Sequence, residues 1–316
     1  MTYVAGGLIQ AADFDGFAGP LPPSQAYSNP SAAADHMAAL IGVGYGDRGY
    51  GQTSTTLPAV TAGQIITAAT WNNLLNSMGT SNTHQGSGLT LQPTVAPGGR
   101  IIAQDGNNGT VSISTLINTL DSNRLSANVT EMTVSSVLTS STSTPWGGII
   151  EHVFTVNFGT EDAARYFFNS GGQIRLSGSN VGGSTPDAAS WAALLSQMGT
   201  IKFGATTTTY TGSGGTVASI GYYGMTGSNQ QLFIHYGSGT YYAGNYYAIQ
   251  AYRGNYSGAN GGNGSLLTFT ATFNNTSGYY YHGSTVNGTT TSYVDQYKAT
   301  GVLSIQNPSF ATTTSL

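Results

Sequence analysis

The chain has 316 residues, a net charge of −4 and no cysteine, and only 6% of its residues are charged, compared with about 25% in an average globular protein. Its 8 Lys and Arg residues are too few for a basic surface that binds nucleic acid or anionic lipid, and no apolar run is long enough for membrane insertion. The lack of cysteine excludes disulfides, thiolate metal sites and a cysteine nucleophile.

The first 95 residues read as short helices joined by glycine-rich loops, and we expect them to form an N-terminal docking module. The clearest helix covers residues 68–78, with Thr67 as its N-cap and Gly79 as the glycine that ends it. It carries an apolar stripe at helical spacing: Trp71, Leu74, Leu75 and Met78. Residues 187–200 repeat this pattern, so a second copy of the same capped helix is expected there.

The rest of the N-terminal half is less regular. A helix is expected over residues 31–40, and the glycine-rich segment 42–52, which includes Tyr50, is expected to be a structured loop. Residues 96–145 differ in composition from the segments before and after them, and we predict that they form a connector. Within them, the Ser/Thr/Val run 133–144 fits a strand and an extended arm equally well.

Residues 146–316 read as a β-domain. Polar and apolar residues alternate over residues 151–158, which places His152, Phe154, Val156 and Phe158 on one face of a strand. Further segments with a strand pattern are 173–176, 200–203, 216–222, 231–236, 246–252, 266–273 and 300–305. Helices are expected at 161–168 and 186–198. Glycine-bearing turns between the strands favour an antiparallel β-sandwich, so the predicted fold is mainly β with a few short helices.

The sequence offers no specific catalytic or metal-binding constellation. No two of the 5 histidines have a spacing typical of metal ligands. The close acidic pairs Asp13/Asp15 and Glu161/Asp162 lie at predicted helix starts, where acidic residues complement the helix dipole. No G-x-S-x-G motif indicates a serine hydrolase. We therefore predict no catalytic residues, no metal and no cofactor, and a protein that is not an enzyme.

Tyrosine is the residue type that most needs a functional explanation. Tyr241, Tyr242, Tyr246 and Tyr247 lie beside Gly, Ser and Asn, a combination that antibody loops use for adaptable contact surfaces. They are therefore candidates for contact with a protein or a glycan. An equally good interpretation is that tyrosine simply replaces phenylalanine on half-exposed strands.

Two further segments resemble a known family. Residues 152–158 read HVFTVNF and residues 164–175 read ARYFFNSGGQIR, which together resemble the HxFTVxF…ARYFFNxGGxIR signature of tailed-bacteriophage virion structural proteins, of the tail-fibre or neck type. The G-x-x-I-x-A-x-x-W-N element of such proteins is similar to residues 63–72, and their Gly-Tyr-Gly-Gln loop to residues 49–52. The matching pieces span much of residues 6–200, whereas the tyrosine-rich remainder is similar only in texture.

The resemblance implies a structural subunit of the tail, neck or fibre of a tailed phage, which assembles with copies of itself, with a trimer preferred, and with other virion proteins. Arg165 and Arg175 lie in a segment with few charges, so each is expected to have a specific partner such as Glu151, Glu161 or Asp162. The candidates for assembly or contact are Trp71, Tyr50, Arg165, Arg175, Tyr241, Tyr242, Tyr246 and Tyr247.

The expected location is the virion, after assembly in the host cytoplasm, because the N-terminal residues lack the pattern of a secretory signal. Low charge would also reduce repulsion between packed copies. The alternatives are a capsid decoration protein, a polysaccharide hydrolase and a carbohydrate-binding receptor-recognition module with a tyrosine-rich surface. The last of these would add a host surface glycan to the partners.

Overall fold

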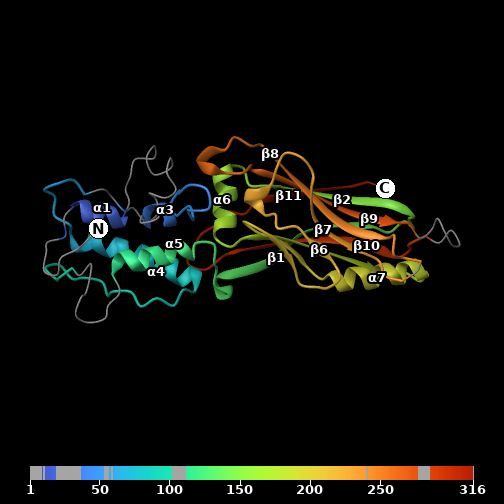
Figure 1. The fold of residues 1–316 in the computed structure, drawn as a ribbon, viewed down its shortest axis with the longest axis horizontal. Helices are drawn as coiled ribbons and strands as arrows, with labels where there is room; N and C mark the ends of the chain where they lie inside the picture. Colours follow the sequence, from blue (N-terminus) through green and yellow to red (C-terminus); the bar gives the residue numbers. More distant parts are fainter. Residues whose placement is uncertain are drawn as a thin grey trace.

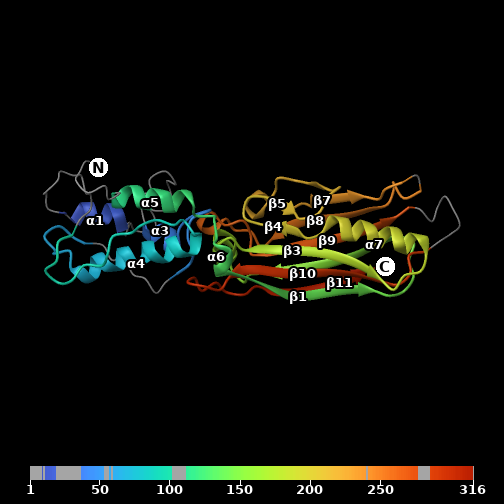
Figure 2. The ribbon, with the colours of Figure 1, turned by 90° about the horizontal axis from the view of Figure 1, so that it is seen from below.

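The computed structural model describes residues 9, 11–18, 37–52, 57, 60–101, 112–239, 241–276 and 285–315. Over these residues the protein is mainly β, with two antiparallel sheets and a few short helices (Figure 1). The molecule is elongated, with the N-terminal helices at one end and the strands running lengthwise towards the other (Figure 2). The predicted fold class, an antiparallel β-sandwich preceded by a helical and loop module, is confirmed.

The described strands form a five-stranded and a six-stranded sheet. The first has the order β1-β10-β3-β4-β5, with β1 (Met132–Thr142), β3 (Gln173–Val181), β4 (Ile201–Phe203), β5 (Thr208–Tyr210) and β10 (Thr289–Ala299). The second has the order β11-β2-β9-β8-β7-β6, with β2 (Gly148–Asn157), β6 (Thr216–Val217), β7 (Gln230–Tyr236), β8 (Tyr246–Gly254), β9 (Leu266–Asn275) and β11 (Ser309–Ser315). Phe203 of one sheet packs on Phe269 of the other with ring centroids 5.3 Å apart, so the sheets are the two layers of a sandwich.

The alternation predicted for residues 151–158 is confirmed by their burial. The side chains that β2 directs into the sandwich are Ile150, His152, Phe154 and Val156. His152 lies with Nδ1 2.9 Å from Oγ of Ser292 on β10 and Nε2 3.1 Å from Oγ1 of Thr142 on β1. Burial lowers the pKa of His152 to about 4. The neutral ring therefore joins the two sheets through hydrogen bonds.

A helix closes one side of the sandwich. α7 (Pro186–Met198) begins after Thr185, whose side chain caps its first turn, and ends at Gly199, which has a φ of 62°. It packs along β3 and lies between the two sheets on that side (Figure 2). Trp191 projects from α7 into the core, with its ring 5.4 Å from that of Trp146. The helix predicted for residues 186–198 thus has the expected bounds.

The N-terminal part contains α1 (Ala11–Ala18), α3 (Met37–Ile41), α4 (Ala68–Gln85) and α5 (Ile113–Ser122). Trp71 of α4 is fully buried between Phe14 and Phe17 of α1, with ring centroids 6.3 and 6.2 Å away. α6 (Glu161–Asn169) lies across the middle of the molecule, where these helices meet the sandwich (Figure 1). Short 3-10 turns are η1 (Val129–Glu131), η2 (Tyr222–Gly224) and η3 (Ala259–Gly261).

Some of the expected boundaries are wrong. α4 does not end at Gly79 but continues to Gln85 and ends at Gly86, which has a φ of 66°. A glycine inside a helix costs only about 1 kcal/mol, and the residues that follow Gly79 continue the buried face of the helix. The helix predicted over residues 31–40 is described only from Met37 onward, and its earlier residues lie outside the described part.

Two strand predictions are also wrong. Residues 300–305 form a turn and loop between β10 and β11, and only Thr216 and Val217 of the segment 216–222 are in a strand. β10 and β11 were not among the predicted strands, because the sequence of β10, TTTSYVDQYKA, is rich in polar residues that alternate poorly. Pairing with β1 and β3 on both sides nevertheless makes β10 a central strand.

The range 96–145 contains two elements that pack with the rest of the chain. α5 buries Ile113, Leu116, Ile117 and Leu120. The run 133–144, which the sequence leaves open between a strand and an arm, forms most of β1 and pairs with β10. These residues are therefore integral parts of the helical end and of the first sheet.

Candidate functional site

The glycine-rich loop 42–52 is the main link between the two parts of the molecule. It folds back beside the end of α3, where the backbone N–H groups of Tyr50 and Gln52 donate to the carbonyls of Leu40 and Ile41 over 3.0 and 2.9 Å. Its turns then direct several carbonyl oxygens towards α6. The predicted structured loop is confirmed.

Arg165 of α6 holds this loop. The residue is fully buried, and its guanidinium donates to the carbonyl oxygens of Val43 and Gly46 over 3.1 Å and of Arg48 over 2.8 Å. Its Nη1 forms an ion pair with Asp162 at 2.6 Å. Asp162 is one of the partners expected from the sequence, and the three backbone carbonyls add acceptors that a buried cation needs.

Two further side chains complete the junction. Asn169 donates from Nδ2 to the carbonyls of Gly46 and Gly49, both over 3.1 Å. The hydroxyl of Tyr223 lies 2.6 Å from the carbonyl of Gly46 and 2.7 Å from Oδ1 of Asn169. Burial raises the pKa of Tyr223, so the hydroxyl remains protonated and can donate. Neither Asn169 nor Tyr223 was among the residues predicted for assembly or contact.

Close packing accompanies these hydrogen bonds. Gly51 has a φ of 69°, and a Cβ at this position would collide with the ring of Tyr166 on α6. The Gly-Tyr-Gly-Gln segment 49–52 and the segment 164–175 are therefore in direct contact. Both segments carry the resemblance to phage virion proteins described above.

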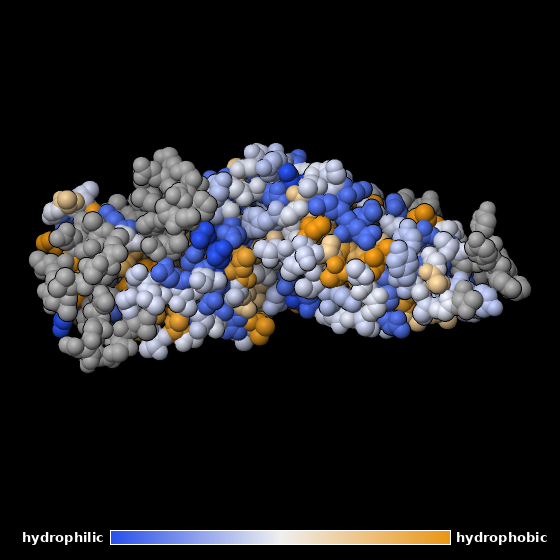
Figure 3. Space-filling model, in the orientation of Figure 1, coloured by the Kyte–Doolittle hydropathy of each residue, from blue (hydrophilic) through white to orange (hydrophobic). Residues whose placement is uncertain are grey.

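Ion pairs tie the same loop to α5. Nε and Nη2 of Arg48 donate to Asp121 over 2.7 and 3.0 Å, and Arg124 pairs with Asp47 at 2.6 Å. The hydroxyl of Tyr50 donates to the carbonyl of Arg124 over 2.7 Å. Three of the chain's 8 Lys and Arg residues thus meet at this junction. Hydrophilic residues gather at this boundary on the face shown in Figure 3.

The acidic pair at the start of α6 fixes a second loop, 257–260. Glu161 accepts from the backbone N–H groups of Ser257 and Ala259, and Asp162 accepts from Nδ2 of Asn260 over 2.9 Å. Although burial alone would raise the pKa of Glu161, these hydrogen bonds lower it. The pair lies in the first helical turn as predicted, and its carboxylates also hold this neighbouring loop.

Four of the predicted contact residues are not on the surface. They are fully buried, so none of them can meet another molecule while this fold is intact: Trp71, Tyr50, Arg165 and Tyr247. Arg175 does not pair with any of the predicted carboxylates; its guanidinium carbon lies 3.8 Å from the ring centroid of Tyr297. Its Nε donates to Gln173 over 2.9 Å.

The remaining tyrosines lie near the end of the molecule away from the N-terminal helices. Tyr241 is 61% exposed, whereas Tyr242 and Tyr246 are half-buried. Tyr236, which the sequence did not single out, is 54% exposed and packs on Tyr246 with ring centroids 5.7 Å apart. Strand alternation explains why Tyr247 is buried and its neighbour Tyr246 is not.

Over the described ranges, no three His, Asp or Glu side chains gather as a metal site, and no helix there could cross a membrane. The chemistry of the junction is hydrogen bonding and ion pairing between two parts of one chain. No family model matches the chain, and neither the curated proteins nor the solved structures contain a significant match.

Proposed function

We propose that the chain is a structural subunit of a tailed-phage virion, in the tail, neck or fibre. The junction around Arg165 is the observation that carries this proposal. A fully buried arginine with four hydrogen-bonded partners holds the helical end against the sandwich. Such a connection suits a protein that transmits position and load along its length.

The placement of the residues in the matching segments supports the same proposal. Arg165 and Asn169 of one segment bind the carbonyls of the loop that contains the other, and His152 joins the two sheets. In the matching segment 63–72, the Asn72 side chain holds the backbone of Val95 through hydrogen bonds of 2.8 and 3.0 Å. The resemblance therefore coincides with residues that hold this fold together.

The proposed subunit docks to the particle through its N-terminal helical end and directs the sandwich outward. Its partners are copies of itself, in a cyclic arrangement for which we prefer a trimer, and other virion proteins. It is assembled in the host cytoplasm and acts without a catalytic centre or a cofactor. The low content of charged residues, 6% of the chain, supports close packing of identical copies.

Two measurements test this proposal. Antibodies raised against the full chain are expected to label tailed particles in a lysate at one fixed position, as seen by immunogold electron microscopy. Light scattering of the purified full chain is expected to give the mass of a closed oligomer. Particles that carry no label, together with a chain that stays monomeric at high concentration, would contradict the proposal.

A further inference from the structure

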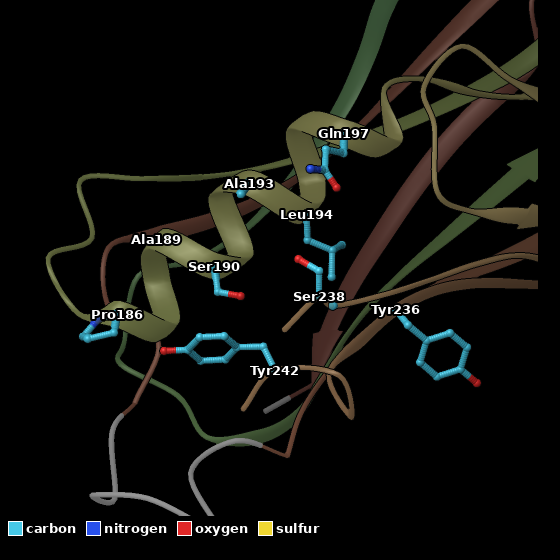
Figure 4. A pocket seen from close by; sticks show the side chains of 10 residues that line it. Pro186, Ala189, Ser190, Ala193, Leu194, Gln197, Tyr236, Ser238 and Tyr242 are labelled. Atoms are coloured by element: carbon cyan, nitrogen blue, oxygen red, sulfur yellow. The ribbon is translucent and has the colours of Figure 1, made fainter. Parts of the chain in front are cut away.

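A groove lies between α7 and the turn that connects β7 to β8. Its volume is about 390 Å³. α7, which forms one wall, lies in the part of the sandwich remote from the N-terminal helices (Figure 1), and Figure 4 shows the lining side chains from close by. The residues that line it are Pro186, Ala189, Ser190, Ala193, Leu194, Gln197, Tyr236, Gly237, Ser238 and Tyr242. This volume is within the range of small-molecule sites.

The lining is neutral and amphipathic. Ala189, Ala193 and Leu194 form an apolar strip along α7, while Ser190 and Gln197 add a hydroxyl and an amide beside it (Figure 4). None of the lining side chains carries a charge. The groove therefore selects against a ligand whose binding depends on an ionic contact.

Tyr242 lies across one end of the groove, with its hydroxyl directed towards the first turn of α7 (Figure 4). Burial and the neighbouring Asp187 carboxylate raise the pKa of Tyr242, so the hydroxyl stays protonated. A backbone hydrogen bond in the β7–β8 connection holds this residue: Asn245 donates its N–H to the carbonyl of Tyr242 over 2.9 Å. Gly237 has no room for a side chain, because a Cβ there would collide with the same carbonyl.

We propose that this groove binds a neutral saccharide. The flat face of a sugar ring carries C–H groups that pack on an aromatic ring and on an apolar strip, while its hydroxyls need neutral donors and acceptors. The groove supplies both kinds of surface: the ring of Tyr242 lies at one end near Ser190, and Ser238 and Gln197 add polar groups along the rest of the lining (Figure 4). A charge-free lining fits a neutral sugar better than an acidic one.

The residues that carry this proposal differ from the tyrosine set that the sequence indicates. Tyr247 is buried in the core, and Tyr241 and Tyr246 do not line the groove. Tyr236 and Tyr242 line it instead, together with α7. The inference also goes beyond the proposed virion role and does not depend on it. If the chain binds a saccharide but antibodies against it label no particle, the saccharide site is supported and the virion role is contradicted.

The test uses the full-length chain on a printed array that carries neutral oligosaccharides of glucose, galactose, mannose, rhamnose and N-acetylglucosamine beside sialylated and sulfated ones. Tyr242→Ala removes the aromatic surface. Ala193→Trp fills the groove from an exposed helix position without removing any tyrosine. Tyr252→Ala is the matched control, because Tyr252 is 36% exposed on β8 and does not line the groove.

We expect the wild-type chain and Tyr252→Ala to bind at least one neutral saccharide equally well. Both groove variants are expected to lose at least ten-fold in affinity for that saccharide. Circular dichroism and thermal melting check that each variant is folded; should one of them fail to fold, the other still tests the groove. Three results would overturn the proposal: no binding to any saccharide, binding to acidic glycans only, or binding that a folded groove variant retains.

Discussion

Replacement of Arg165 by Met tests whether the junction holds the two parts of the molecule together. Met keeps an aliphatic stem in the buried space but removes every donor of the guanidinium. The carbonyl of Gly46 retains two other donors, from side chains of α6 and η2. Over the described residues, the carbonyls of Val43 and Arg48 have Arg165 as their side-chain donor and lose it in the variant.

The expected cost follows from these contacts. A buried acceptor left without a donor costs about 1–3 kcal/mol, and two carbonyls are affected. The ion pair with Asp162, whose side chain is 32% exposed, adds at most about 1 kcal/mol. We therefore expect Arg165→Met to lower the free energy of unfolding by about 3–5 kcal/mol, most of it from the two carbonyls that lose their donor. Arg175→Met, which loses a half-buried stacking contact on Tyr297, is expected to cost about 0.5–1 kcal/mol.

Urea unfolding followed by tryptophan fluorescence measures both variants. Trp71 reports on the helical end, while Trp146 and Trp191 report on the sandwich, so the signal follows both parts. We expect Arg165→Met to unfold at a lower urea concentration, with the helical end losing structure first. If Arg165→Met and Arg175→Met have the same effect within error, the buried arginine does not hold the junction and the reasoning is refuted.

Three other predictions concern stability. His84 and His152 are both buried, and burial lowers the pKa of each to about 4. Since the unfolded chain binds protons at these residues from about pH 6.5 downward, each histidine is expected to lower the free energy of unfolding by about 2 kcal/mol by pH 5. Urea midpoints that stay constant from pH 7 to pH 5 would contradict this prediction. Gly51→Ala is expected to lower the free energy of unfolding by more than about 2 kcal/mol, because its Cβ meets an aromatic ring of α6. Gly46 has a similar φ but open space around it, so Gly46→Ala should cost about 1 kcal/mol. Equal losses of melting temperature in the two variants would argue against the close contact at Gly51. Gly79→Ala is expected to stabilise the chain by about 0.5–1 kcal/mol, since Gly79 is an interior residue of α4 and the new methyl group has room beside Leu91. A lower melting temperature would show that the methyl group does not fit.

The parts of the fold that could be predicted from the sequence are those with strong local signals. α7 has a capping threonine before it and a glycine after it, and its residues repeat at helical spacing, so its bounds were predicted correctly. β2 alternates cleanly and its buried face was predicted as well. In contrast, β10 has little alternation of its own, and its place in the sheet comes from the strands on both sides of it.

The candidate site was only partly predictable for a similar reason. The scarcity of charge made Arg165 stand out, and Asp162 was among its expected partners. The carbonyls that Arg165 binds belong to the backbone. Because every residue has a backbone carbonyl, the sequence does not indicate which of them accept a hydrogen bond. Tyr242 was among the tyrosines named as contact candidates, but whether Tyr242 or Tyr247 faces a groove depends on tertiary packing.

The pairing of distant strands has a consequence for how the chain acquires its structure. Val153 on β2 accepts a hydrogen bond from Thr312 on β11, 159 residues away, and Ser135 on β1 meets Gln296 on β10, 161 residues away. β1, at the edge of one sheet, and β2, inside the other, therefore pair with strands that are synthesised much later, and such non-local pairing slows folding. During synthesis the helical end can form early, while β1 and β2 remain unpaired and almost uncharged. This interval is when the nascent chain most needs a chaperone or early contact with its own copies.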